Sequence, residues 1–206
     1  MRIRLRDGSE KTVDITKGKN LIQGASFVYH YDALPMGDPD KLELLDLAFP
    51  AYLGAVPNFK RVLDIDKGDV HKALQSASEL LRQIPKGLPL TDWPDTTEHR
   101  ELLHSLFRAT TGGRNPSLPG FGAATSTKML HKKRPDLIPI VDRWQFDAWG
   151  AKTMIDVVFC IQNMLRPQVD EFIALRDCLT SGESNLPYLS LIRLYDIMFW
   201  KLSNKL

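Results

Sequence analysis

The sequence predicts a mainly α-helical single domain that covers residues 1–206, with two lobes arranged around a loop at 110–120. The first observation is helical periodicity, because apolar residues recur at spacings of three and four, most clearly over 70–81. The second is the place of helix-capping residues, such as Thr96, directly before apolar stripes. The third is an alternating segment at the N-terminus, which predicts a small β-hairpin appendage at 1–17.

The N-terminal hairpin is predicted from two alternating runs, 2–6 and 11–15, which flank Asp7-Gly8. Asp-Gly between such runs is a strong hairpin signal, because both residues tolerate the positive φ that a tight turn needs. The next segment, 21–36, has no helical period, and we expect an ordered loop or an extended segment there.

Three helices are predicted in the first half of the chain. Asp38 is the expected N-cap, and Pro39 the first residue, of a helix that stops near Pro50. A second helix opens near Asp69, and a third is capped by the threonines at 96–97.

The second half combines an irregular stretch with further helices. The Gly-, Asn- and Pro-rich residues at 110–118 predict an irregular loop. Helical patterns then follow at 123–131, 153–165, 167–179 and 188–202.

Composition excludes several classes of protein. No apolar run reaches the ~20 residues of a membrane-spanning helix, and the N-terminus lacks the apolar middle of a secretory signal. Two cysteines, Cys160 and Cys178, cannot form a disulfide scaffold, and the five histidines lack metal-ligand spacing. We therefore expect a cytoplasmic protein without a metal site. The net charge of +2 still permits a local basic patch.

The segment with the most specific chemistry is Gly120-Phe121-Gly122, which leads directly into the helix that begins at Ala123. Glycines let the backbone approach a ligand, and the first amides of a helix lack internal partners at the positive end of its dipole. Together these features predict a phosphate site. The alternative is a tight helix-entry turn without a ligand. A dinucleotide fingerprint is a poor match, since the third glycine is missing.

The wider segment, LPGFGAATSTKMLHKKRPDLIPIVD at 118–142, resembles the helix-hairpin-helix motif of DNA-binding proteins. Asp142 lies 22 positions after Gly120 and follows an apolar lead-in. This spacing is similar to that of the helix-hairpin-helix DNA glycosylase superfamily, of the endonuclease III and alkyladenine glycosylase type. The segment also resembles an uncharacterised bacterial family related to those glycosylases.

The resemblance implies that Asp142 is the catalytic carboxylate that faces a flipped nucleotide. A carboxylate near C1′ stabilises the positive charge that develops on the sugar and orients the attacking water. Bifunctional members carry a lysine where this chain has Ala124, so cleavage of the DNA backbone through a Schiff base is not expected. The alternative role of Asp142 is N-cap of the helix that begins at Arg143, and both roles can hold at once.

DNA contacts are expected along the hairpin and the helix that follows it. Residues 128–134 carry four formal positive charges, which would follow the DNA backbone and make binding sensitive to salt. The alternative is a solvated helix C-terminus, where cations suit the helix dipole. The expected DNA-binding residues are Gly120, Phe121, Gly122, Ala123, Thr125, Lys128, Lys132, Lys133, Arg134 and Arg143.

A pocket for the flipped base needs aromatic surfaces and a few polar groups. We expect Tyr29, Tyr31 and Asp32 there, because they gather in a segment without helical period, together with Trp144 beside the aspartate. The alternative is that these aromatic residues belong to the core. In the glycosylases a wedge residue fills the gap left by the flipped base, and here the segment 52–58 would supply it.

The resulting hypothesis is a monomeric protein that binds double-stranded DNA and hydrolyses the N-glycosidic bond of a modified or damaged base. It needs no cofactor, although the hairpin leaves room for a monovalent cation. One alternative is a non-catalytic helix-hairpin-helix module that only binds DNA. Another is a domain with structural resemblance alone, which serves protein partners.

Overall fold

The computed structural model describes residues 1–26, 28–56, 67–112, 118, 120–181 and 186–204. The fold is mainly helical with one small antiparallel sheet, which confirms the predicted class. The strands are β1 (Arg2–Arg4) and β2 (Glu10–Thr12), and the helices are α1 (Ile15–Gln23), η1 (Val28–Asp32), η2 (Leu44–Leu53), α3 (Lys67–Leu81), η3 (Leu90–Asp92), α4 (Thr97–Thr110), α5 (Ala123–Lys133), α6 (Arg143–Trp149), α7 (Met154–Leu165), η4 (Arg166–Gln168), α8 (Val169–Thr180) and α9 (Leu191–Ser203).

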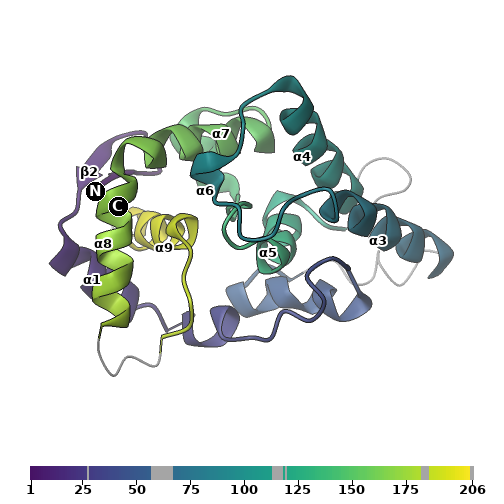
Figure 1. Ribbon diagram of the computed structural model, residues 1–206, viewed down its shortest axis with the longest axis horizontal. Coiled ribbons are helices and arrows are strands. Elements are labelled where there is room, and N and C mark those ends of the chain that lie inside the picture. Colours follow the sequence, from purple (N-terminus) through teal and green to yellow (C-terminus); the bar gives the residue numbers. More distant parts are fainter. Residues whose placement is uncertain (27, 57–66, 113–117, 119, 182–185, 205–206) are drawn as a thin grey trace.

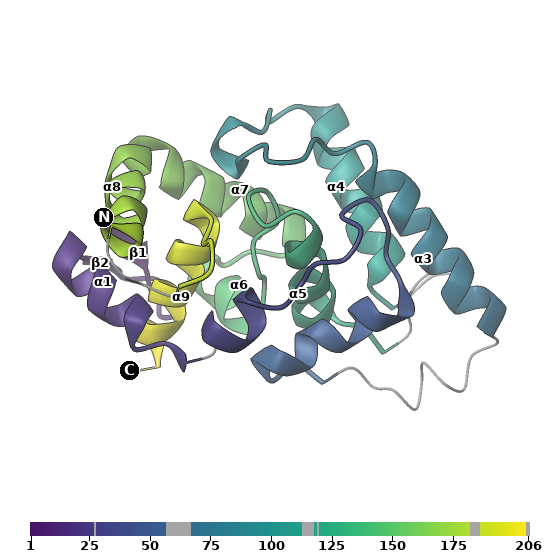
Figure 2. The same ribbon diagram turned by 60° about the horizontal axis from the view of Figure 1, so that its bottom comes forward.

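The first and last helices of the chain pack together at one end of the molecule. There α1 lies against α8 and α9, while α3 and α4 form an antiparallel pair at the other end (Figure 1). Between them, η2 lies along α5 (Figure 2). Helix α7 contacts both α4 and α9 and so connects the two ends.

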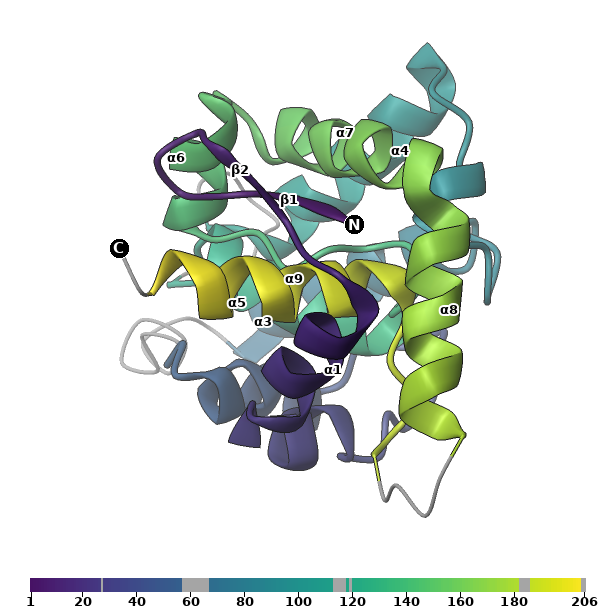
Figure 3. The same ribbon diagram turned by 90° about the vertical axis from the view of Figure 1, so that its left-hand side faces the viewer.

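The N-terminal hairpin is confirmed, but its description as an appendage is wrong. Arg2 pairs with Thr12, and Gly8 has a φ of +83° in the turn. The side chain of Ile3 is fully buried, and β1 packs on α9 (Figure 3). The alternating pattern predicted the strands but not the helix that they cover, so the hairpin belongs to the core.

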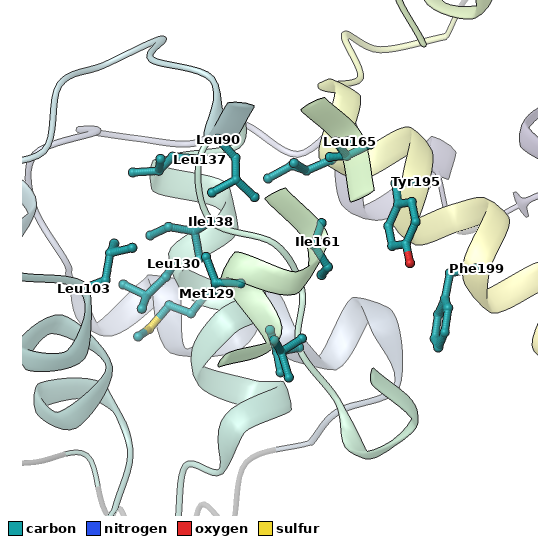
Figure 4. Close-up of a cluster of buried hydrophobic side chains, with 14 of the residues drawn as sticks. Leu90, Leu103, Met129, Leu130, Leu137, Ile138, Ile161, Leu165, Tyr195 and Phe199 are labelled. Atoms are coloured by element: carbon teal, nitrogen blue, oxygen red, sulfur yellow. The ribbon is translucent and has the colours of Figure 1, made fainter. Parts of the chain in front are cut away.

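One continuous hydrophobic core holds these elements together. Met129 and Leu130 of α5, Ile161 of α7 and Tyr195 of α9 lie within it (Figure 4). All four side chains are buried, and they come from helices far apart in the sequence. This core places the faces of α5 and α9 at a fixed distance from one another, which matters for the site described below.

Most helices match their predicted positions, and two segments differ. The region 21–36, expected to be non-helical, contains the end of α1 and the π-helix η1. The helix expected from Asp38 begins only at Leu44, because Asp38 instead accepts a hydrogen bond from the amide of Asp40 in a turn. Pro50 lies inside this 3-10 helix, and Gly54 ends it.

Among the described residues, no helix combines the length and the apolar character needed to cross a membrane.

Candidate functional site

A cavity of about 210 Å³ opens beside Asp142. It is bounded by the end of η2, the middle of α5, the segment directly before α6, and one face of α9. On α9 the spacing of three and four residues places its lining side chains on that single face. The lining residues are Tyr52, Leu53, Lys128, Ile140, Asp142, Arg193, Asp196 and Trp200.

Asp142 is the N-cap of α6, which confirms the capping prediction. Its Oδ1 accepts hydrogen bonds from the backbone amides of Trp144 at 2.9 Å and Gln145 at 3.2 Å. The side chain nevertheless lines the cavity, and no described residue donates a hydrogen bond to Oδ2. Capping therefore fixes the orientation of this carboxylate while one oxygen stays available to a ligand.

Thr127 of α5 connects Asp142 to the hairpin. The buried hydroxyl of Thr127 accepts a hydrogen bond from the amide of Val141 at 2.9 Å and donates to the carbonyl of Ala123 at 2.8 Å. Since Val141 directly precedes Asp142, the carboxylate is held relative to the first turn of α5.

The Gly-Phe-Gly segment forms the predicted entry to α5. Gly120 has a φ of +79°, a conformation that favours glycine, and Gly122 is the N-cap. The hydroxyl of Thr125 accepts a hydrogen bond from the Gly122 amide at 2.8 Å. Phe121 and Thr125 are buried, so their side chains are not available to DNA. A phosphate could therefore bind only to the backbone of this segment, at the first amides of α5 beside the exposed Gly122.

The predicted basic surface at 132–134 is wrong, because these side chains are buried. Lys132 donates to the backbone carbonyls of Tyr31, Asp32 and Leu34 at 3.1, 3.3 and 2.8 Å. A cation that is occupied by carbonyl oxygens inside the protein cannot follow a DNA backbone.

Lys133 and Arg134 bind the segment that Lys132 also binds, residues 31–40. Lys133 donates to the carbonyl of Asp38 at 3.0 Å and forms an ion pair with buried Asp46 at 2.9 Å. Arg134 pairs with Asp40 at 2.9 Å and donates to four backbone carbonyls. The cations of α5 therefore fasten residues 31–40 to the helix. The sequence shows the positive charges of these residues, but it does not show that backbone carbonyls of a distant segment cover them.

The side chain of His131, directly before these three cations, is also buried. Burial lowers the pKa of His131 to about 3, and the charge of Arg193 adds to this effect. The neutral ring donates from Nδ1 to the carbonyl of Ile138 at 2.7 Å. This contact holds the chain that leads from α5 to Asp142.

Three of the residues predicted for the base pocket, Tyr31, Asp32 and Trp144, do not line the cavity. Tyr31 is fully buried and donates its hydroxyl proton to the Lys128 carbonyl, and Asp32 forms an ion pair with Arg193. Trp144 stacks on Trp200 with ring centroids 6.3 Å apart, so it supports a wall of the cavity from outside. The side chain of Tyr29 lies outside the described part of the chain.

Sequence reasoning missed the contribution of α9. Arg193, Asp196 and Trp200 all belong to the helix predicted at 188–202, and of these three none is among the predicted site residues. The signal was present, since an arginine and an aspartate three residues apart interrupt an otherwise apolar helix on one face. Tyr52, from the segment expected to supply a wedge, stands half-exposed at the edge of the cavity.

A network of charges underlies the cavity. Arg193 donates from Nε and Nη2 to Asp32, each at 2.9 Å, and from Nη1 to Asp196. Lys128 donates to the Leu53 carbonyl at 3.0 Å, and burial lowers the pKa of its amine. Burial also raises the pKa of Asp196 to about 6, with the charge of Asp142 adding to the rise and Arg193 and Lys128 opposing it.

Comparison with known proteins adds a family. Residues 18–203 match a family of unknown function, DUF6308. The chain belongs to this family. The part shared with DUF6308 includes every described residue that lines the cavity, whereas β1 and β2 lie outside it. No curated protein and no solved structure matches the chain.

Within the described ranges of this DUF6308 member, no three His, Cys, Asp or Glu side chains lie close enough together to hold a metal ion.

Proposed function

We propose that this protein is a DNA glycosylase without lyase activity, which flips a modified or damaged base and hydrolyses its N-glycosidic bond. The observation that carries the proposal is the cavity beside Asp142. It combines a fixed carboxylate with the aromatic side chains of Tyr52 and Trp200, and its volume of about 210 Å³ suits one flipped base. Such a pocket, with stacking surfaces and a few polar groups, is what base excision requires.

The first turn of α5 supplies the DNA contact in this proposal. Its unpaired amides and the helix dipole attract a phosphate, and the Thr127–Val141 hydrogen bond keeps that phosphate in register with Asp142. Exposed Arg143 adds a positive charge beside the carboxylate. These few cationic contacts predict a modest salt dependence, in place of the steep one that a basic surface at 128–134 would give.

The arrangement of helices supports a two-lobed glycosylase-like architecture. The cavity lies between Lys128 of α5 on one side and Arg193 and Trp200 of α9 on the other. Helix α9 packs with α1 and α8, whereas α5 packs with η2 and α4. A base that enters between these two groups would meet both aromatic walls.

In the proposed reaction, the flipped base stacks between Tyr52 and Trp200, which brings C1′ to Asp142. The carboxylate stabilises the developing positive charge on the sugar and orients the water that attacks C1′. Because Ala124 stands at the position of the lyase lysine, the product is an intact strand with an abasic site.

The test is to incubate the protein with duplexes that each carry one altered base, and to score strand breaks after alkali. We expect breaks only after alkali, and their loss by at least 100-fold in Asp142→Asn. Asparagine caps helices about as well as aspartate, so this variant keeps its fold and its DNA binding. The matched control is Asp177→Asn, on the exposed surface of α8.

Each other outcome contradicts a defined part of the proposal. DNA binding without abasic sites for any base would leave a non-catalytic binding module. Equal excision by Asp142→Asn would remove its assigned role. Breaks without alkali would show lyase activity and point to Lys128, whose amine lies in the cavity.

A further inference from the structure

Asp196 is the second carboxylate that the cavity presents. It lies on α9 one turn after Arg193, and its side chain is 14% exposed. Oδ2 accepts a hydrogen bond from Nη1 of Arg193, whereas no described residue donates to Oδ1. Asp196 therefore combines burial with one oxygen that a ligand in the cavity can reach.

Asp196 shares its cation with a second carboxylate. Arg193 donates from Nη1 to Asp196 and from Nε and Nη2 to Asp32, and Lys132 is a further cation close to Asp32 and Arg193. Among the described residues that line the cavity, the carboxylates are Asp142 and Asp196 and the cations are Lys128 and Arg193. Because Arg193 serves two carboxylates and Asp142 adds a nearby negative charge, a proton on one carboxylate relieves their repulsion in this partly buried site.

The proton belongs most naturally on Asp196. Asp32 accepts several hydrogen bonds from Arg193, and Asp142 accepts two from backbone amides, whereas Asp196 accepts one. Burial and the nearby charge of Asp142 raise the pKa of Asp196 to about 6, despite the opposing charges of Arg193 and Lys128. Tyr31, which also faces Arg193, stays neutral because burial raises its pKa.

We propose that Asp196, in its carboxylic acid form, donates its proton to the departing base. This inference rests on the proposed glycosylase function and assigns the two carboxylates different tasks. As the C1′–N bond breaks, its electron pair moves to the base, and the Asp196 proton is bound by a ring nitrogen or carbonyl oxygen of that base. Water then forms the C1′–O bond and releases a proton to Asp142, and solvent exchange returns both groups to their starting states.

This assignment specifies the substrate class. A neutral base is a poor leaving group and needs a proton, whereas a base that already carries a positive charge does not. Two carboxylates in different environments, one protonated and one ionised, are the usual arrangement for acid-assisted cleavage of a glycosidic bond. The cavity is thus suited to a neutral altered base.

The first test measures the proton directly and needs no substrate. Carboxyl ¹³C resonances of aspartate-labelled protein are followed against pH, and the Asp196→Asn variant identifies the Asp196 signal. We expect a midpoint near pH 6 that falls in Asp142→Asn, since this variant removes a neighbouring negative charge. A midpoint below about pH 4.5 would overturn the proposal.

The second test compares two bases under single-turnover conditions, neutral hypoxanthine and cationic 7-methylguanine, each in a duplex. We expect Asp196→Asn to slow hypoxanthine release by at least about 100-fold and 7-methylguanine release by less than about tenfold. For the intact protein, hypoxanthine release should fall about tenfold per pH unit above pH 6. Asp177→Asn is the matched control.

The outcomes separate this inference from the function on which it rests. Equal loss on both bases would show that Asp196 only supports the structure, and excision of 7-methylguanine alone would also overturn proton donation. No excision of any base would contradict the glycosylase function, and the ¹³C titration would still decide whether Asp196 holds the proton.

Discussion

At the scale of single residues, the ion pair of Lys133 and Asp46 is almost completely buried. Replacing Lys133 by methionine leaves the buried charge of Asp46 without its cation, and loss of one member of a buried pair costs about 3–5 kcal/mol. We expect Lys133→Met to lower the free energy of unfolding in urea by that amount. Lys72→Met, at an exposed position of α3, should change it by less than about 0.5 kcal/mol. A similar small effect of Lys133→Met would mean that the attachment of residues 31–40 to α5 does not depend on this cation.

His131 and Asp196 predict pH effects of opposite sign. The pKa of His131 falls from 6.5 to about 3 on folding, so the unfolded chain binds the proton more tightly and acid weakens the fold below pH 6.5. The pKa of Asp196 rises from 3.8 to about 6, so its protonation strengthens the fold as the pH falls from 6 towards 4. Each slope approaches about 1.4 kcal/mol per pH unit.

These slopes appear as differences between the protein and a variant, measured by urea unfolding at several pH values. His131→Gln should remove the acid-dependent loss, and Asp196→Asn should remove the acid-dependent gain. A difference of the same sign for both variants would contradict the burial of one of the two groups.

At the scale of elements, the segment that enters α5 contains two glycines with different roles, one structural and one in the proposed phosphate site. Gly120 adopts a φ of +79°, so Gly120→Ala should destabilise the fold by about 1–2 kcal/mol. A Cβ at Gly122 would meet no atom within 4 Å, so Gly122→Ala should fold normally. It should nevertheless weaken binding to a duplex with an abasic-site analogue by about tenfold, because the methyl group stands where a phosphate would approach. Anisotropy measurements would show this, and unchanged binding would remove the phosphate from this helix end.

The elements also show what sequence reasoning can and cannot reach. Caps such as Thr96 and Asp142 are local signals, because the side chain bonds to an amide two or three residues away, and both were predicted. The cavity depends on α5 and α9 lying on opposite sides of it, and their lining residues Lys128 and Arg193 are 65 positions apart. No local pattern encodes that arrangement. The buried cations were misread for the same reason, since their partners lie in a distant segment.

At the scale of the whole molecule, the N-terminal hairpin is part of the common core. Ile3 has no exposed surface and lies in the same hydrophobic cluster as Tyr195 and Leu175. Ile3→Ala should therefore lower the free energy of unfolding by about 2–5 kcal/mol in a single cooperative transition. Urea unfolding followed by tryptophan fluorescence would measure this. A change below about 1 kcal/mol, or a separate early transition, would show that the hairpin is an appendage and not part of the core.

The fastening of residues 31–40 to α5 has a consequence for how the family can diverge. Lys132, Lys133 and Arg134 recognise backbone carbonyls, and every residue type carries the same carbonyl. Relatives can therefore exchange most side chains between Ala33 and Pro39 without disturbing the attachment. A change at any of the three cations would leave buried carbonyls unpaired at once. We therefore expect the residues between Ala33 and Pro39 to vary among members of the family, and the three cations at 132–134 to be conserved.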